Sequence, residues 1–408
     1  MTSPDLPRHD TYPGLDGLRF LGALAVLVTH VAFQTGAYAG TLAGTALSRL
    51  DVGVAIFFVL SGFLLSRPWL LAAEHATPRP RTGRYWWHRA VRILPAYLVT
   101  VVVALLVLEE NAGASLRTWV ANLGLVALYT EDRLPPGLTQ MWSLATEVAF
   151  YAALPLVMLA ALGRRPQRVP AGRLLVVLTG LCALNLAWNA GGSRLVATST
   201  ALLQWLPGYL TWFSAGIALA AVTVVLRRAE PPGWARTVAD VGSAPWTCWG
   251  LAAAVFVVAS TPLAGPYDFT QIASDASVVT KNLLYVVVGV LVVLPGVFAP
   301  AGSTFLRLTT RPLLRHLGRT SYALFCCHLV VLDLVQQWLD LPVFGGRTVL
   351  VLALTLAGSL LVSEVLYRLV EVPATRLRSL RPSDLVRSRR GGSSTSSPAQ
   401  TSETTTAS

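Results

Sequence analysis

Long runs of apolar residues, separated by short polar stretches, make up most of this chain. Each run is close to the roughly 20 residues that an α-helix needs to cross the roughly 30 Å hydrocarbon core of a bilayer. We therefore predict an all-α, polytopic transmembrane bundle of about ten spans. The spans are expected near residues 15–35, 52–70, 91–108, 141–160, 174–190, 204–226, 246–263, 279–300, 317–338 and 347–370.

Three stretches are predicted to lie outside these spans. Residues 116–132 hold an uncharged run of about 13 residues, too short for a span, so we expect a re-entrant or interfacial helix there. Residues 1–14 lack the basic start and cleavage site of a signal peptide, so the first span is expected to stay in the mature protein. Residues 379–408 are basic and then Ser/Thr-rich, which is typical of disorder. This divides the chain into a membrane domain at 1–378 and a tail.

The charged residues differ in sign from loop to loop. Cytoplasmic loops of membrane proteins carry an excess of Lys and Arg. The basic loops hold Arg67, Arg79, Arg81, Arg84, Arg89, Arg164, Arg165, Arg168, Arg173, Arg227, Arg228, Arg307, Arg311 and Arg315. The loops between them hold Glu109, Glu110, Glu131, Asp132, Asp268, Asp275 and Asp340. We therefore predict a multi-pass protein of the cell membrane with both termini in the cytoplasm.

Composition narrows the function classes. The chain is 54% hydrophobic and 13% charged, with a mean hydropathy of +0.58, which excludes an ordinary soluble domain. The net charge of +12 lies in loops between apolar runs, so membrane orientation accounts for it better than nucleic-acid binding. The four cysteines fall within predicted spans without metal-ligand spacing. Neither disulfides nor a metal site is expected.

The first span carries two ionisable residues on one face. Arg19 and His30 are eleven residues apart, and eleven steps of about 100° return to within about 20° of the starting direction. The two residues then lie about 16 Å apart along the helix. Ionisable groups inside a membrane usually serve function. A purely structural interpretation is equally favoured: the arginine side chain extends to the membrane surface, and the histidine lies at the end of the helix.

Two further motifs combine charge with helical spacing. Arg89 and Arg92 share a face at the start of the third span. Guanidinium groups at this position would suit a phosphorylated ligand. The simpler interpretation is that they are the basic residues that usually flank the cytoplasmic end of a span. Glu147 lies about two turns into an apolar helix and needs a partner. That partner is either a histidine that it orients, a donor hydroxyl, or an arginine in a structural pair.

His328 and the last span have less specific signals. His328 lies in the middle of its span, where a catalytic role and a hydrogen bond between helices are equally plausible. Glu364, Arg368 and Glu371 lie near the inner end of the last span at spacings of four and three. Local pairing at those spacings explains them.

Several segments together resemble the acyltransferase-3 family of membrane O-acyltransferases. They are LDGLRFLGALAVLVTH, DVGVAIFFVLSGFLL, RYWWHRAVRILPAY, MWSLATEVAFY and LGRTSYALFCCHLVVL, followed by LYRLVEVPATRL. They occur in the family's order and extend to about residue 378. The family's arginine and histidine then correspond to Arg19 and His30, and its arginine pair to Arg89 and Arg92. Its tryptophan, serine and glutamate signature corresponds to Trp142, Ser143 and Glu147.

The resemblance implies transfer of an acyl group, by preference acetyl, from cytosolic acyl-CoA to a hydroxyl of a sugar. His30 is then the base or the acyl carrier, and Arg89 and Arg92, with Arg84 as a further candidate, hold the donor. Glu147 is expected to hold the imidazole of His30. Arg19 either guides the pantetheine arm or stabilises the carbonyl oxygen. Acyl-CoA is a substrate here, and no permanently bound cofactor is expected.

The acceptor side is less defined. Trp142, Ser143 and His328 are candidates for acceptor binding, although a cysteine replaces the family's usual aromatic neighbour of His328 in YALFCCH. The acceptor is expected to be a surface glycan, a glycolipid or a glycosylated natural product. The family's frequent extracytoplasmic hydrolase-like domain has no counterpart in this sequence. A transporter or flippase is the main alternative, but it often shows repeat symmetry and broken helices, and the sequence indicates neither.

Overall fold

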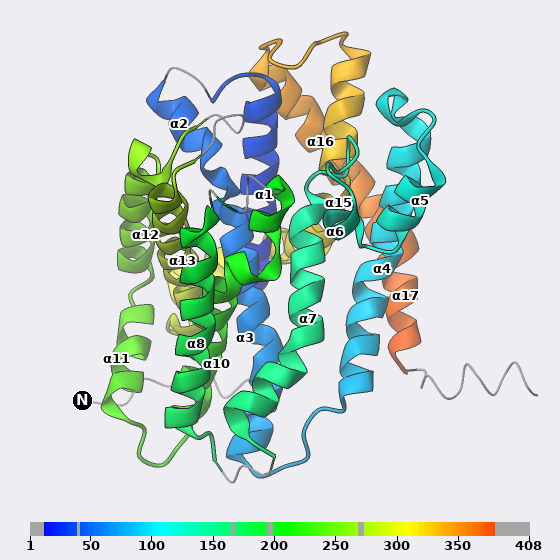
Figure 1. The fold of residues 1–408 in the computed structure, drawn as a ribbon. Helices are drawn as coiled ribbons and strands as arrows, with labels where there is room; N and C mark the ends of the chain where they lie inside the picture. The colour runs from blue at the N-terminus through cyan, green and yellow to red at the C-terminus, as the bar shows by residue number, and fades with distance from the viewer. Residues whose placement is uncertain are drawn as a thin grey trace, which may run out of the picture.

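The computed structural model describes residues 12–38, 41–164, 168–192, 194, 199–267 and 273–379, which form a bundle of helices. Within these residues there is no strand. Most helices run along one common axis in Figure 1. The all-α, multi-pass architecture predicted from the apolar runs is confirmed. The predicted tail lies almost wholly outside the described residues.

Nine helices among the described residues are long and apolar enough to cross a membrane. Eight of them are continuous or nearly so: α1 (Gly14–Gln34), α3 (Gly53–Glu74), α4 (Thr82–Val107), α7 (Met141–Leu162), α8 (Ala171–Ala190), α10 (Leu210–Val225, after the 3₁₀ turns Thr200–Gln204 and Leu206–Tyr209), α13 (Asp275–Phe298) and α15 (Pro312–Trp338). The ninth consists of α16 (Thr348–Leu366), a π-helical turn (Tyr367–Glu371) and α17 (Val372–Arg376), followed by a 3₁₀ turn (Leu377–Ser379).

The span predicted at 246–263 differs from the others. The structure has α11 (Gly233–Gly242) and α12 (Pro245–Ala259), which meet at a bend of 83°. Pro245 begins α12, because a proline has no backbone N–H to donate and fits best at the first helical position. Taken as one bent element, the pair raises the number of possible spans to ten.

Short helices and 3₁₀ turns lie between the long helices along the chain. They are α2 (Leu42–Ser48), the 3₁₀ turn Leu50–Val52, the 3₁₀ turn Glu109–Asn111, α5 (Leu116–Leu123), α6 (Ala127–Thr130), the 3₁₀ turn Pro262–Ala264 and α14 (Thr304–Thr309). The segment 116–132 therefore forms two short helices, and neither of them is a spanning helix.

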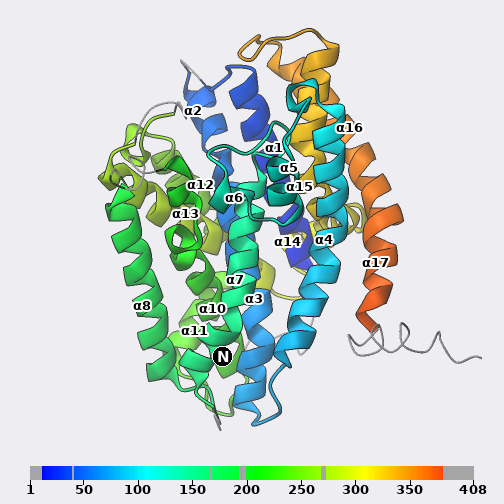
Figure 2. The same ribbon diagram turned by 45° about the vertical axis from the view of Figure 1, so that its right-hand side comes forward.

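Helix α3 lies in the middle of the bundle, behind α7 in Figures 1 and 2. Gly62 on α3 and Gly216 on α10 allow the two backbones to touch, since a Cβ at Gly62 would lie 2.2 Å from the carbonyl oxygen of Phe213. Helices α1 and α15 approach in the same way, because a Cβ at Gly318 would lie 2.1 Å from the carbonyl oxygen of Asp16. Small residues at such crossings are typical of membrane helix packing.

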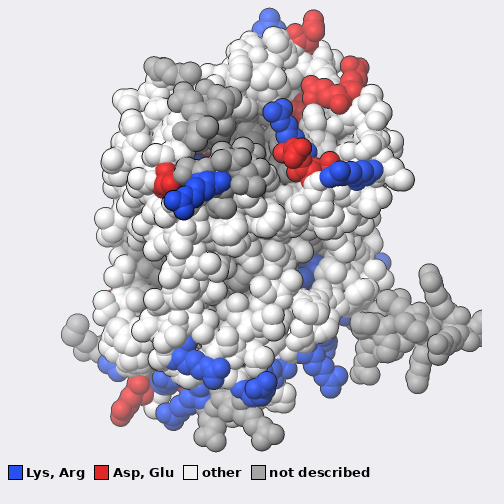
Figure 3. Space-filling model, viewed as in Figure 1, with Lys and Arg blue, Asp and Glu red and all other residues white. Residues whose placement is uncertain are grey.

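The two ends of the bundle differ in charge. Figure 3 shows Lys and Arg side chains gathered along its lower edge and most acidic side chains near its upper edge. We call the lower end, where α3, α7 and α10 finish, the basic end. Arg228 there donates to Glu74 at 2.7 Å, and this bond raises the pKa of Arg228. At the other end, Lys281 pairs with Asp51 at 2.6 Å.

Candidate active site

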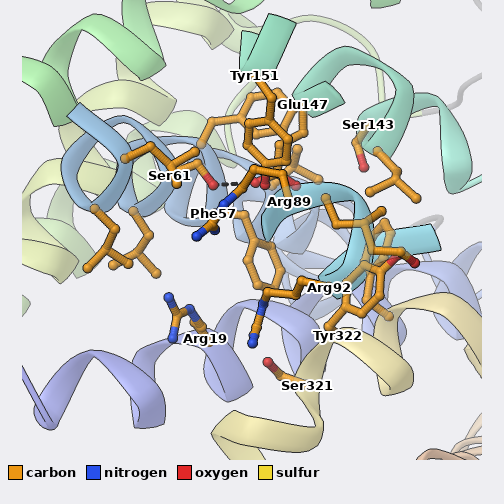
Figure 4. A pocket seen from close by; sticks show the side chains of 18 residues that line it. Arg19, Phe57, Ser61, Arg89, Arg92, Ser143, Glu147, Tyr151, Ser321 and Tyr322 are labelled. Atoms are coloured by element: carbon orange, nitrogen blue, oxygen red, sulfur yellow. Dashed lines mark hydrogen bonds between the residues drawn. The ribbon is translucent and has the colours of Figure 1, made fainter. Parts of the chain in front are cut away.

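A polar cavity lies between the middle of the bundle and its basic end. Helices α1, α3, α4, α7 and α15 enclose it, and its volume is about 100 Å³. Its polar lining, labelled in Figure 4, consists of Arg19, Ser61, Arg89, Arg92, Ser143, Glu147, Tyr151, Ser321 and Tyr322. We call this space the arginine cavity.

Three guanidinium groups reach the arginine cavity from two helices. Arg89 and Arg92 extend from one face of α4, and Arg19 lies across from them on α1 (Figure 4). Trp86 helps to fix which face of α4 points into the cavity, because its indole N–H donates to the carbonyl oxygen of Tyr151 on α7 at 3.2 Å. Arg19 also pairs with Asp16 one turn earlier at 3.0 Å. The cavity therefore carries a strong positive charge.

Glu147 is the carboxylate of this cavity. The hydroxyl of Ser61 donates to its Oε1 atom, and Figure 4 shows the two side chains facing each other. Arg19 and Arg89 both act on Glu147 electrostatically. Glu147 is thus surrounded by a hydroxyl and by guanidinium groups. Of the three partners that the sequence left open, a hydroxyl makes the hydrogen bond to Glu147, and the arginines act on it only electrostatically.

His30 and His328 form a pair in the upper half of the bundle. Nδ1 of His30 lies 3.0 Å from Nε2 of His328, and Nδ1 of His328 lies 2.8 Å from the carbonyl oxygen of Phe325. His328 is 1% exposed, whereas His30 is partly exposed. The histidine pair joins α1 to α15 across a sequence separation of 298 residues.

The hydrogen bonds determine which ring nitrogen carries each proton. A carbonyl oxygen only accepts, so Nδ1 of His328 must donate, and Nε2 of a neutral His328 then holds a lone pair. Nδ1 of His30 must therefore donate to it. Nε2 of a neutral His30 keeps its own lone pair, and no described residue donates to it. This is the state required of a base or a nucleophile.

Our expectation about which residue holds His30 was wrong. We expected Glu147 to hold the imidazole, but among the described residues no hydrogen bond joins the two, and His328 holds it instead. The reason is helix rotation, since Glu147 faces α3 and the arginines. His328, expected as an acceptor-binding residue, makes the hydrogen bond between helices that its mid-span position suggested.

The other predicted residues separate into two places. Ser143 lines the arginine cavity together with Arg19, Arg89, Arg92 and Glu147. Trp142 instead lines a different cavity of about 260 Å³, where its ring lies 5.2 Å from that of Tyr209. Arg84 does not line the arginine cavity.

Sequence reasoning missed Ser61, Tyr151 and Arg378. Ser61 lies in DVGVAIFFVLSGFLL, where it is the only polar side chain after Asp51, and that isolation was the available signal. Arg378 follows the last span, and the bond from the Trp87 indole N–H to the carbonyl oxygen of Leu377 holds this segment against α4 at 3.1 Å. Burial, with the nearby guanidinium groups of Arg92 and Arg89, lowers the pKa of Arg378.

Several of these donors have no hydrogen-bond partner among the described residues. Nε of Arg89 and both Nε and Nη2 of Arg378 are buried and unpaired. Buried donors without partners are costly, so clustered guanidinium groups of this kind indicate an anion-binding site. Among all the residues that the structure describes, no group of three or more His, Cys, Asp and Glu residues is placed to hold a metal ion.

The chain is similar to known acyltransferases over most of its length. The acyltransferase-3 family, described as an acyltransferase domain, matches residues 12–368. Acyltransferase MdmB of Streptomyces mycarofaciens is 33% identical over 189 residues, which cover 43% of this chain and 46% of that protein.

Two further relatives cover more of the chain. A putative O-acetyltransferase of Staphylococcus aureus is 25% identical over 383 residues, 88% of this chain and 57% of that protein. Peptidoglycan O-acetyltransferase OatA of Listeria monocytogenes is 25% identical over 392 residues, 88% of this chain and 55% of that protein. The chain thus spans about half the length of the curated relatives it matches. No solved structure matches it.

Proposed function

The chain belongs to the acyltransferase-3 family, and on that premise we propose that it is an O-acyltransferase. It moves an acyl group, by preference acetyl, from cytosolic acyl-CoA to a hydroxyl of a sugar on a surface glycan, a glycolipid or a glycosylated natural product. The names of two relatives, which describe O-acetyltransferases, support the acetyl group. The family membership disfavours a transporter or flippase.

The observation that carries this proposal is the order of groups along α1 and α15. On α1, Arg19 lines the arginine cavity, and His30 follows about 16 Å farther from the basic end. On α15, Phe325 lines the same cavity, and its carbonyl oxygen accepts the hydrogen bond of His328. A positively charged site therefore adjoins a histidine base through shared helices.

The arginines are suited to the phosphates of the donor. We assign the basic end to the cytosol from its excess of arginine. Arg89, Arg92 and Arg378 then meet the anionic part of acyl-CoA where it enters the bundle. A space of about 100 Å³ is too small for the nucleotide, so the nucleotide stays at the mouth while the pantetheine arm passes through the cavity toward the histidine pair.

Arg19 is assigned to the pantetheine arm. The rise of about 16 Å between Arg19 and His30 exceeds what the two side chains can bridge to reach one carbonyl oxygen. Arg19 therefore guides the arm past Asp16, and the alternative role at the carbonyl oxygen is disfavoured. Glu147 balances part of the charge of the guanidinium groups, and the hydrogen bond from Ser61 holds its carboxylate in place.

His30 performs the proton transfer. Its Nε2 atom takes the proton of the acceptor hydroxyl while that oxygen attacks the thioester carbon. The C–S bond then breaks, the ester forms, and the coenzyme A thiolate takes the proton from Nε2. His328 accepts the hydrogen bond from Nδ1 of His30 throughout, so it holds the base in the required tautomer.

The test compares His30→Ala and His30→Gln with wild type. Membranes carrying each protein are mixed with acetyl-CoA and a panel of glycans, glycolipids and glycosides, and coenzyme A release is measured. Loss of a positioned base should reduce turnover about 10²- to 10⁴-fold. His75→Ala is the matched control, because His75 is exposed at the basic end. Thermal unfolding in detergent checks the fold of each variant.

Two results would contradict the proposal. Folded His30 variants with wild-type turnover would remove His30 from the mechanism. Movement of a glycoside across the membrane by the wild-type protein, without any release of coenzyme A, would identify a transporter.

A further inference from the structure

A third cavity, larger than the two described above, lies at the end of the bundle opposite the basic end. It has a volume of about 790 Å³ and is enclosed by the end of α1, the end of α15 and the segments 110–139 and 340–343. We call it the outer cavity. Its charged and amide lining includes Gln34, Glu110, Glu131, Asp333, Gln336 and Asp340.

The outer cavity comes to within about one helical turn of the histidine pair, on the side away from the arginine cavity. Gln34 lines it and lies four residues after His30, about one turn farther along α1. Leu329 also lines it and directly follows His328. His30 is partly exposed even though it lies inside the bundle. The histidine pair is therefore about one helical turn from each of the two cavities.

Gln336 indicates that the outer cavity receives a polar ligand. Its side chain lines the cavity and is only 7% exposed, yet its amide makes no hydrogen bond with any described residue. Asp333, which is 9% exposed, lies three residues earlier on the same helix face. The amide donors and acceptor therefore stay free toward the cavity, so a ligand that donates to Gln336 or accepts from it would be bound there.

The charge of the outer cavity restricts which ligand it can take. Its lining has four carboxylates and one arginine, Arg133, and Glu131 is already paired with Arg117 at 2.9 Å. The remaining carboxylates accept hydrogen bonds from hydroxyl or ammonium groups and repel anions. Pro135, Pro136 and Val343 add apolar surface for the C–H face of a sugar ring or for an aglycone.

We infer that the outer cavity binds the acceptor and that its carboxylates select a neutral or aminated sugar over an acidic one. This inference rests on the proposed function and adds the place and charge of the acceptor. Asp333 and Gln336 contact hydroxyl or amino groups of the sugar, whose reacting hydroxyl then points toward Nε2 of His30.

The experiment uses three methyl glycosides that differ in one group: a glucoside, a glucosaminide and a glucuronide. Their binding to the purified full-length protein in detergent is measured by thermal stabilisation without donor. The first two should stabilise the wild-type protein, and the glucuronide should not. Asp333→Asn should weaken binding of the glucosaminide about 10- to 150-fold, the range for one hydrogen bond to a charged group. Gln336→Leu should weaken binding of the glucoside and of the glucosaminide about tenfold or less.

The control is a pair of neighbouring glutamates. Glu110→Gln removes a carboxylate from the outer cavity, whereas Glu109→Gln removes the adjacent exposed carboxylate outside it. Only the Glu110 variant should bind the glucuronide better. Failure of all three glycosides to bind, or equal binding of the glucuronide, would overturn the inference.

Steady-state assays with acetyl-CoA separate the two proposals. Asp333→Asn should raise KM for the acceptor and leave KM for acetyl-CoA unchanged. Transfer that continues with an unchanged acceptor KM would refute the outer cavity as the acceptor site while the proposed function stands. Selective glycoside binding without transfer from acetyl-CoA would refute the proposed function while the binding site stands.

Discussion

Replacing His328 by alanine tests whether this residue acts through His30. The substitution removes the 3.0 Å hydrogen bond that holds Nδ1 of His30 and leaves Nε2 of His30 in place. His328→Gln keeps a carbonyl oxygen that can accept the same bond. His328 lies outside the lining of the arginine cavity, so donor binding should not change.

The size of the effect follows from the charge that His30 gains. When Nε2 takes a proton, the bond from Nδ1 to His328 becomes a hydrogen bond from a charged donor, which contributes about 1.5–3 kcal/mol. Because about 1.4 kcal/mol corresponds to a factor of ten in rate, kcat should fall about 10- to 150-fold in His328→Ala. That range lies mostly below the 10²- to 10⁴-fold loss expected when His30 itself is removed.

The assay measures kcat and KM for acetyl-CoA, with thermal unfolding as the check on folding. KM for acetyl-CoA should equal that of wild type, and His328→Gln should recover part of the lost kcat. His328 is 1% exposed, so some loss of stability is expected in both variants. If folded His328→Ala loses as much activity as His30→Ala, His328 itself acts on the substrate. Wild-type kcat in that variant would show that the histidine pair is only structural.

Three further perturbations test the donor site, the orientation and the packing. Arg89→Lys keeps the charge but loses the planar fork, so it should raise KM for acetyl-CoA, and Arg89→Ala should raise it more; unchanged values in both would leave the arginine with a topological role only. A cysteine at Pro80 should resist labelling from outside intact cells, and one at Asp132 should react; the reverse pattern would invert the orientation. Gly62→Ala places a Cβ 2.2 Å from a backbone oxygen and should cost about 1–3 kcal/mol, seen as a lower Tm. Gly83→Ala, with open space around it on a helix, should not lower Tm, because alanine favours the helix more than glycine does.

Helix boundaries show where hydropathy is informative and where it is not. The third span was expected to begin at residue 91, but α4 begins at Thr82, nine residues earlier. Hydropathy reports which residues prefer lipid, whereas a helix continues through polar residues wherever its backbone bonds are made. The polar turns from Thr82 to Arg89 are held by Trp86 and Trp87, whose indole N–H groups bond to distant carbonyl oxygens. These contacts cannot be read from local composition.

The sequence by itself determined the helical membrane architecture and the family, because both follow from properties that are local in the chain. Apolar run length specifies a span, and the spacing of Arg19 and His30, or of Arg89 and Arg92, specifies a shared helix face.

Only the tertiary structure decided which faces meet. Periodicity gives the direction of a side chain around its own helix, but the partner depends on how distant helices pack, and small residues such as Gly62 and Gly318 set that packing. His30 therefore pairs with a histidine 298 residues away, and Glu147 pairs with a serine 86 residues away. The pairing of His30 with His328 instead of Glu147 is a consequence of close contact between α1 and α15, which no local pattern in the chain encodes.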